Sequence, residues 1–238
     1  HYLAHAGLSQ IITFSFMHKD GLTNMMLPEG DNRYTAIPIL NPISEEFPYM
    51  RTTLVPAVIE AAKRNIAQQN KDLWLFETAN VYEPKALPLT EVPHERPMAC
   101  GIMMGKVTEA AWNQAQRDTD FYDVKGVVDG LLAKLGLTQY DIQPSSESYY
   151  HPGVSAHYTV NGVTIANYGE LHPQVVKNFD LSGKVYMFEI DLEAVLSIIV
   201  PPFRYQSFSK FPGTSRDLAI VAPVSVTSGD IVALIKEH

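Results

Sequence analysis

Three histidines in the second half of the chain carry the side chain that most often binds a transition metal. His151 and His157 stand six residues apart across Pro152-Gly153, and His172 follows directly before Pro173. Structural zinc sites combine histidines with cysteines at short fixed spacings, but no cysteine stands near these three. Their spacing also fits no single helix face. We therefore expect structural hydrogen bonds from all three, with His172 at the entry of a helix, and no metal site.

Three closely spaced aspartates, Asp120, Asp123 and Asp129, have the side chain of a general acid or base. The helix expected to begin at Asp120 accounts for all three aspartates without a catalytic role. Asp120 stands where a carboxylate caps the first turn, Asp123 lies in that turn, where the helix dipole favours negative charge, and Asp129 lies on the polar face. The sequence therefore predicts no catalytic residue among them.

Arg51 is the cation best placed to bind an anion. It lies between a turn and a helix N-terminus, where a guanidinium could hold an anionic ligand or a carboxylate of a neighbouring element. A structural ion pair is the favoured interpretation. The alternative is a free-standing enzyme that uses the open face of a sheet, with Arg51, His151 or Glu170 activating a ligand.

Composition limits the class of protein. The 238 residues are 46% hydrophobic, enough for one large core with a small second unit. The single Cys100 excludes an internal disulfide and lies in an apolar run, which predicts a packed thiol. A net charge of -8 argues against a main nucleic-acid surface. No stretch is long enough to cross a bilayer, and we expect a cytoplasmic protein without a membrane partner.

Apolar runs rich in β-branched and aromatic residues predict strands over residues 10–16, 73–82, 98–104 and 184–192. Asn161-Gly162 stands between alternating residues and predicts a hairpin. Four prolines lie within residues 83–97, which are expected to form a loop. In the last strand, large apolar residues alternate with Met187, Glu189 and Asp191, so one face of that strand is expected to contact solvent.

Periodic apolar residues predict three helices. The first begins at Thr53 as its cap, tolerates Pro56 in its first turn and ends near residue 70; the second runs from Asp120 to Gly136; the third covers residues 173–179. The methionines grouped at positions 25–26 and 98–104 favour a buried core or a subunit interface.

A linker is predicted near residue 203, because Pro201-Pro202 precedes the polar run 204–210. After it, residues 216–222 predict a strand, and Thr227 or Ser228 caps a helix. One strand and one helix cannot bury a core alone. The sequence therefore predicts two domains, a large one over residues 1–203 and an incomplete one over residues 204–238.

Several stretches together resemble the β subunit of bacterial phenylalanyl-tRNA synthetase. They are Asn41-Pro-Ile-Ser44, Met50-Arg-Thr-Thr-Leu-Val-Pro56, Tyr150-His-Pro-Gly-Val-Ser-Ala156 and Gly169-Glu-Leu-His-Pro173. Past the linker, Phe211-Pro-Gly-Thr-Ser-Arg-Asp-Leu218 is similar to the opening of that family's ferredoxin-like anticodon-binding domain. The resemblance implies an α+β fold, with an antiparallel sheet of class II synthetase type flanked by helices and then a truncated ferredoxin-like segment.

The resemblance also implies that this catalytic-like domain has lost its chemistry. In class II enzymes an arginine follows the first strand of the second motif, where this sequence has Glu83. The third motif needs glycines and an arginine, where Glu189, Asp191 and Ala194 stand. Carboxylates repel phosphate. We expect no catalytic, cofactor-binding or metal residue in this chain.

The partners implied by the resemblance are those of a holoenzyme. A catalytic α subunit would bind ATP, Mg²⁺ and phenylalanine, two α and two β chains would form a heterotetramer, and tRNA would contact β mainly through other domains. The editing domain and a metal-associated region would precede His1. An exposed apolar interface would also let the fragment form a homodimer. A ligand- or RNA-binding module without catalysis remains the other alternative.

Overall fold

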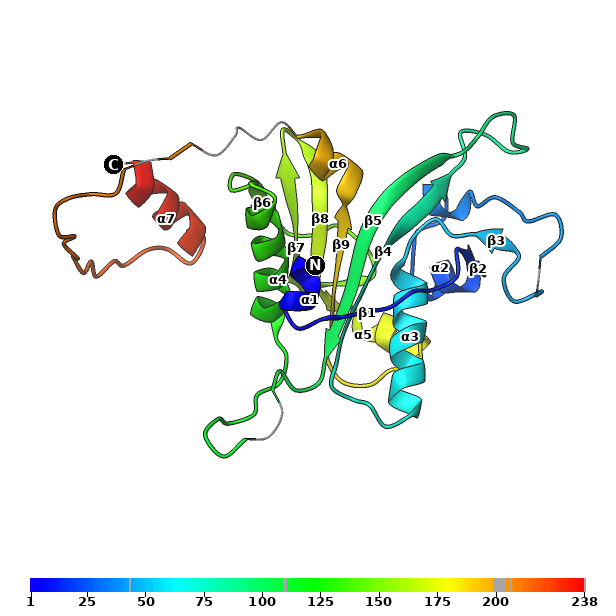
Figure 1. Ribbon diagram of the computed structural model, residues 1–238, viewed down its shortest axis with the longest axis horizontal. Helices are drawn as coiled ribbons and strands as arrows, with labels where there is room; N and C mark the ends of the chain where they lie inside the picture. Colours follow the sequence, from blue (N-terminus) through cyan, green and yellow to red (C-terminus); the bar gives the residue numbers. More distant parts are fainter. Residues whose placement is uncertain (43, 109–110, 199–203, 206, 238) are drawn as a thin grey trace. The chain divides into compact units, whose positions relative to one another are not determined.

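The computed structural model describes residues 1–238 except 43, 109–110, 199–203, 206 and 238. The chain divides into two compact units, His1–Pro201 and Pro202–His238. The boundary predicted near residue 203 lies outside the described residues. Figure 1 labels the helices and strands of both units. Among the described residues, no helix has both the length and the apolar character needed to cross a membrane.

A seven-stranded sheet forms the centre of the first unit, with the strand order β1-β4-β5-β9-β8-β7-β6. Every neighbouring pair is antiparallel except β1 and β4, which run parallel. A separate two-stranded sheet pairs β2 with β3. The strands are β1 Ser9–Gln10, β2 Phe16–Met17, β3 Tyr49–Met50, β4 Leu73–Glu83, β5 His94–Met104, β6 Asp141–Gln143, β7 Tyr150–Val160, β8 Val163–Leu171 and β9 Val185–Asp191.

Two long helices cover opposite faces of this sheet (Figure 1). Helix α3, Val55–Ala67, packs with Cys100 and Ile102 of β5, whereas helix α4, Phe121–Lys134, packs with Ala99 and Met103 of the same strand. Alternate side chains of a strand point to opposite faces, so β5 contributes to both cores. The shorter helices are α1 Tyr2–His5, α2 Asp20–Asn24, η1 Asn32–Tyr34, α5 Pro173–Asn178 and α6 Leu192–Ser197.

Local sequence signals position several of these elements as expected. Asp120 accepts hydrogen bonds from the first turn of α4, and the Asp123 carboxylate accepts one from the Asp120 amide, which completes a capping box. The hairpin turn Asn161-Gly162 has φ values of 52° and 80°, as a type I′ turn requires. Helix α4 ends before Gly136, whose φ is 86°. The predicted helices and hairpin are confirmed.

Strand β9 corrects the expectation of a solvent-exposed face. Met187 is fully buried and Glu189 is 8% exposed, while Tyr186 and Phe188 on the other face are buried too. The strand lies between β5 and β8 in the middle of the sheet, so both of its faces lie under other elements. The prediction from alternating residues, that one face of this strand contacts solvent, is therefore wrong.

Three element boundaries differ from the sequence prediction. Residues 10–16 do not form one strand, because the chain leaves the sheet after β1 and pairs again only in β2. Strand β5 begins at His94 and includes Pro97; before Met98 it pairs with β4 alone, an edge position where proline is tolerated. Helix α3 ends at Ala67, three residues before the predicted end.

The methionines are core residues of this chain. Met25, Met98, Met103 and Met104 are all at most 8% exposed. Met98 and Met104 belong to the core under α3, and Met103 belongs to the core under α4. Core packing is therefore correct for these four methionines, whereas Met26 is only partly buried against the core under α3.

The second unit contains helix α7, Ser228–Glu237. Thr227 and Asp230 form a reciprocal capping box at its start, which confirms the predicted cap. The strand predicted over residues 216–222 is wrong, since these residues are exposed and form no ladder. A β-strand is stabilised by pairing with another strand, and the described residues of this unit supply none.

Gly101 in β5 is required by close packing. A Cβ atom there would lie 2.4 Å from the Phe188 ring and 3.0 Å from the Leu75 carbonyl oxygen. We expect Gly101→Ala to lower the free energy of unfolding by about 1–3 kcal/mol, because the ring must move. Gly126 in α4 is the matched control, since nothing lies within 4 Å and Gly126→Ala should stabilise the helix by up to about 1 kcal/mol. Urea unfolding of both variants measures the two shifts, and shifts of the same sign would contradict this packing.

Candidate functional site

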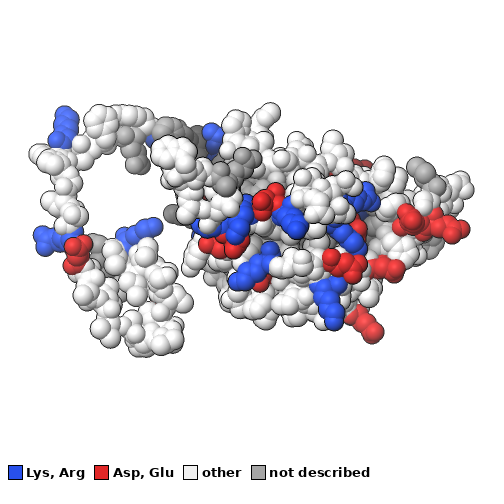
Figure 2. All heavy atoms as spheres, turned by 90° about the horizontal axis from the view of Figure 1, so that it is seen from below, with Lys and Arg blue, Asp and Glu red and all other residues white. Residues whose placement is uncertain are grey.

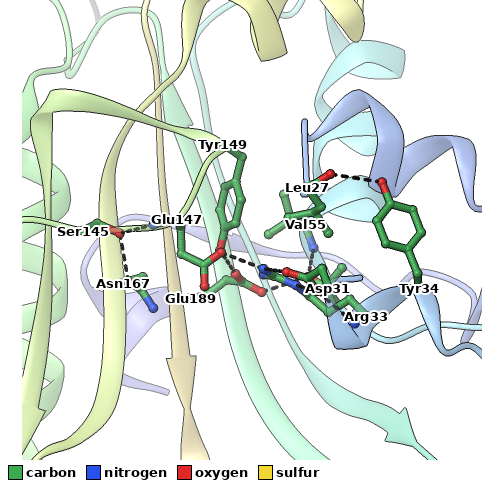
Figure 3. Close-up of polar contacts among 11 residues, drawn as sticks. Leu27, Asp31, Arg33, Tyr34, Val55, Ser145, Glu147, Tyr149, Asn167 and Glu189 are labelled. Carbon is green, nitrogen blue, oxygen red and sulfur yellow. Dashed lines mark hydrogen bonds and ion pairs between the residues drawn. The ribbon is translucent and has the colours of Figure 1, made fainter. Parts of the chain in front are cut away.

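A polar cavity of about 250 Å³ lies against the sheet in the first unit. Thr53, just before α3, and Glu189 of β9 contribute to its lining, and Arg33, Arg96 and Glu147 bring charge to its wall. Figure 3 shows Arg33, Glu147 and Glu189 turned toward one another from separate parts of the chain. This cavity is the candidate functional site, because it collects charged side chains from four different segments of the chain.

Arg33 is held between two carboxylates. Its Nε and Nη2 atoms donate to Asp31 at 2.9 and 2.8 Å, and Nη2 also donates to Glu147 Oε2 at 2.7 Å. The hydrogen bond from Arg33 lowers the pKa of Asp31. The guanidinium carbon also lies 5.7 Å from the centre of the Tyr149 ring. Arg33 is therefore neutralised by groups of its own chain.

Arg96 of β5 has the same kind of surroundings. Its Nη2 lies 3.2 Å from Glu83 Oε1 and its Nη1 lies 3.7 Å from Asp191 Oδ2. Glu83, the last residue of β4, is the residue that the sequence analysis places at the arginine position of the second class II motif. Both arginines of the cavity thus have two carboxylate neighbours, although the buried Arg96 Nε has no hydrogen-bond partner among the described residues.

Glu189 of β9 lines the cavity and is only 8% exposed. Its Oε1 accepts a hydrogen bond from Thr53 Oγ1 at 3.0 Å, and its Oε2 accepts one from the Tyr149 hydroxyl. Burial raises the pKa of Glu189 and also that of the Tyr149 hydroxyl. Thr53 Oγ1 in turn accepts from the Val55 amide at 3.2 Å, although the N-cap of α3 is Leu54 and not Thr53 as predicted. The carboxyl group therefore serves packing and hydrogen bonding inside the protein.

Asp191 and Ala194 meet at the start of α6. Asp191 is the N-cap of this helix, and its Oδ1 accepts from the Ala194 amide at 2.9 Å. Asp191 also lines the cavity, whereas Ala194 packs at the edge of the core under α4. Asp191 and Ala194, which the sequence analysis places in the third class II motif, therefore join the end of β9 to the start of α6.

Arg51 lies outside the cavity and forms the ion pair that its position favours. Its Nη1 lies 3.1 Å from Glu77 Oε1, and its Nε donates to the Asn80 carbonyl at 2.9 Å. Arg51 and Glu77 are 3% and 2% exposed. Burial of both charges, with several hydrogen bonds each, gives this pair a structural role and leaves no open side for a ligand.

The histidines make separate local hydrogen bonds. His172 caps α5 by accepting from the Gln174 amide at 3.1 Å, and His151 accepts from the Gly153 amide at 3.0 Å. His157 Nδ1 lies 3.0 Å from the Pro144 carbonyl oxygen. Within the described residues, no three metal-binding side chains of the His, Cys, Asp or Glu type come together.

Asp129 and Glu170 contact tyrosines. The Tyr140 hydroxyl donates to Asp129 Oδ1 at 3.1 Å, and Tyr158 donates to the same oxygen. Tyr186 donates to Glu170 at 3.3 Å. Asp129 was expected on the polar face of the helix, and the structure adds these tyrosine contacts and an ion pair with Lys125. Neither carboxylate lines the cavity.

Arg33, Asp31, Glu147 and Tyr149 were not singled out from the sequence. Arg33 and Glu147 are 114 positions apart, and each stands in a segment without a periodic pattern. The only local signal is the Asp31 side chain, which caps η1 by accepting from the Arg33 amide at 2.9 Å. The fold, rather than any motif, brings these residues together.

The buried Arg51–Glu77 pair gives a prediction for a double-mutant cycle. Arg51→Met or Glu77→Met alone leaves one uncompensated buried charge and should cost about 3–5 kcal/mol. The double variant should be less destabilised than the sum by at least about 1 kcal/mol. The exposed pair Lys85–Glu91, with 75% and 54% exposed side chains, is the control, and its coupling in urea unfolding should stay below about 1 kcal/mol. Additive effects at Arg51 and Glu77 would contradict the pairing.

Glu189 gives a prediction for the pH dependence of stability. Its pKa is raised above 4.5 by burial, so its stabilising contribution is complete below that pH and declines as pH rises through the folded-state pKa. The Glu189→Gln variant cannot ionise at this position. The difference between its free energy of unfolding and that of the unmodified chain should therefore shift in favour of the variant as pH rises from 4.5 to 8. The exposed Glu29→Gln is the control. A difference independent of pH would show that Glu189 is ionised in the fold.

Known proteins resemble this chain in sequence and in fold. The family described as the phenylalanyl tRNA synthetase beta chain CLM domain matches residues 1–192. A phenylalanine–tRNA ligase beta subunit from Geobacter sulfurreducens is 36% identical, over 96% of this chain and 28% of that protein. The Bacillus subtilis beta subunit is 34% identical, over 99% of this chain and 29% of that protein. The chain therefore spans less than a third of the length of these relatives.

A solved structure of similar fold is a pyrrolysyl tRNA synthetase from Desulfitobacterium hafniense. The TM-score is 0.60 at 14% sequence identity, over 82% of this chain and 65% of that one. At this identity the likeness concerns the fold, and it confirms the class II synthetase type of the antiparallel sheet. With the family match over residues 1–192, it follows that the chain belongs to the phenylalanyl-tRNA synthetase β-chain family, within its CLM domain.

Proposed function

We propose that this chain is the catalytic-like part of a phenylalanine–tRNA ligase β subunit and acts as a non-catalytic scaffold. The names of its relatives support the ligase assignment. The observation that carries the loss of catalysis is the pairing of both cavity arginines with carboxylates: Arg33 with Asp31 and Glu147, and Arg96 with Glu83 and Asp191.

Amino-acid activation makes demands that this cavity does not meet. Free arginines must hold the phosphates of ATP and stabilise the charge that develops in the transition state. Here the four carboxylates around two guanidiniums leave an excess of negative charge, and Glu189 also lines the cavity. A triphosphate entering the cavity would break internal ion pairs and meet repulsion from each released carboxylate.

The proposal extends to cofactors, partners and location. ATP, Mg²⁺ and phenylalanine bind on a catalytic α subunit, two α and two β chains form a heterotetramer in the cytoplasm, and tRNA contacts other parts of β. Residues 204–238 are the linker and the first part of an anticodon-binding domain. No catalytic, cofactor-binding or metal residue is assigned to this chain. The free-standing enzyme and the RNA-binding module are not favoured.

Calorimetry tests the loss of nucleotide binding. Titration of Mg-ATP into the full-length β chain without α should give no saturable heat, because the cavity arginines are already paired. The same titration into the α–β holoenzyme is the positive control and should saturate. Saturable binding to β alone that Arg96→Met abolishes would overturn the proposal, since it would place a working nucleotide site in this cavity.

Co-expression tests the scaffold role. The full-length β chain and the α subunit should co-purify and sediment as one complex of two α and two β chains. A β chain that remains separate from α in sedimentation, although folded by circular dichroism, would contradict the assembly role.

A further inference from the structure

The turn that joins β7 to β8 is the only place in the chain where an asparagine directly precedes a glycine. Asn161 and Gly162 are both exposed, with φ values of 52° and 80°. Val160 and Val163 pair on either side of them, so these two residues alone form the loop of the hairpin. Solvent therefore reaches both the Asn161 side-chain amide and the backbone amide that follows it.

The backbone nitrogen of Gly162 is accessible. Among the described residues, its N–H has no hydrogen-bond acceptor. Within the same part of the chain, nothing lies within 4 Å of the place that a Cβ atom would take at Gly162. Glycine has no side chain to crowd its own nitrogen. This nitrogen is therefore neither held by a hydrogen bond nor shielded by a side chain.

Other asparagines lack this combination. Asn113 is exposed, but the amide of the following Gln114 donates a hydrogen bond within its turn. Asn178 precedes Phe179, whose amide donates to the last turn of α5. Asn41 precedes a proline, which has no N–H. Accessibility of the side chain and of the next nitrogen together distinguishes position 161 from each of these.

We propose that Asn161 is a site of spontaneous deamidation. The Gly162 nitrogen attacks Cγ of Asn161, and its proton passes to hydroxide. The bond between Cγ and Nδ2 then breaks, ammonia leaves, and a succinimide ring joins the two residues. Water opens the ring at Cγ to give aspartate, or at the main-chain carbonyl to give isoaspartate. Water is the only reactant consumed, ammonia is the only product released, and no group is oxidised or reduced.

Local opening of the hairpin end permits this attack. The backbone between the two residues must rotate before the side chain reaches the next nitrogen, and the paired strands restrain this rotation. Residues 161–164 are all exposed, so opening this end loses few buried contacts. The reaction is therefore slower in the folded chain than in the unfolded chain, but it remains accessible to the folded one.

The isoaspartyl product changes the length of the loop. In isoaspartate the chain runs through the side-chain carbons, which adds one atom to the backbone of the turn. A two-residue loop fixes the register of the strands that it joins, so the longer loop disrupts the pairing of Val160 with Val163. Thr164 and Ile165 follow directly and line the polar cavity. The modification therefore acts on a hairpin that forms part of the cavity wall.

Both products also place a charge on a segment that has none. No lysine, arginine, aspartate or glutamate stands between Glu147 and Glu170. Figure 2 shows acidic and basic side chains intermingled on one face of the first unit, and ion pairs such as Lys63–Asp180 join them. The carboxylate formed at position 161 would have no lysine or arginine in its own hairpin to pair with.

Ageing of the full-length β chain tests the site. After incubation at mildly alkaline pH, the tryptic peptide of residues 135–177 should gain the mass that replaces NH₂ by OH, and fragmentation should place it at Asn161. Conversion there should be at least about tenfold faster than at Asn167 of the same peptide or at the exposed Asn113, because only Asn161 precedes a residue without Cβ. Equal rates at the three positions would overturn the proposal.

The route through the ring has a separate readout. An isoaspartyl methyltransferase with labelled S-adenosylmethionine counts isoaspartate, which only ring opening produces; aspartate without isoaspartate would exclude the ring. Gly162→Ala should slow conversion by at least about tenfold, because a Cβ crowds the attacking nitrogen, and circular dichroism checks its fold. An unchanged rate in the folded variant would contradict attack by this nitrogen.

Hydrogen exchange tests the effect on the hairpin. In the isoaspartyl form, the amides of Val160 and Val163 should exchange at least about threefold faster than before ageing, because the hairpin end opens more often. Asn161→Gly is the control, since Gly-Gly also forms a type I′ turn and has no side-chain amide to lose. Its exchange should not change with ageing. Equal exchange before and after isoaspartate formation in the unmodified chain would show that the proposed effect on register is wrong.

Discussion

The buried ion pair between Arg51 and Glu77 is the constraint on which the rest of the first unit depends. Two opposite charges at 3% and 2% exposure are tolerated only when each is paired and hydrogen-bonded. The pair meets this condition by binding the Asn80 carbonyl of β4 and the backbone of residues 13–15. The chain on both sides of Arg51 must therefore stay close to β4.

The two residues after Arg51 continue the same network. The Thr52 hydroxyl donates to the Arg33 carbonyl at 2.7 Å, and the Thr53 hydroxyl donates to Glu189. Three consecutive buried polar residues thus contact β4, the segment before β3 and β9. The stretch Met50-Arg-Thr-Thr carried part of the family resemblance, and its arginine was a candidate for binding an anionic ligand. In the structure these residues instead form hydrogen bonds with other segments of the same chain.

Sequence reasoning located the elements whose signals are local. The capping box at Asp120 and the Asn161-Gly162 turn depend on residues within a few positions, and both formed as expected. It failed for β9, because burial of Glu189 depends on elements that cover the sheet from elsewhere in the chain. It also missed the cavity pairs, since the 114 positions between Arg33 and Glu147 leave no periodic trace in the sequence. The carboxylates at Glu83 and Glu189 could be read directly from the sequence, but their partners inside the fold, Arg96 and Tyr149, could not.

The single parallel pairing in the sheet has a consequence for the order of folding. Ser9 and Gln10 of β1 lie beside Leu75 and Phe76 of β4, so their contact closes a loop that contains α2, η1, β2, β3 and α3. Contacts between residues so distant in sequence form slowly, because the intervening chain must lose its freedom first. Hairpins such as β7–β8 close only short loops. The N-terminal edge is therefore expected to join the sheet late, and a growing chain would complete its antiparallel strands before that edge takes its final shape.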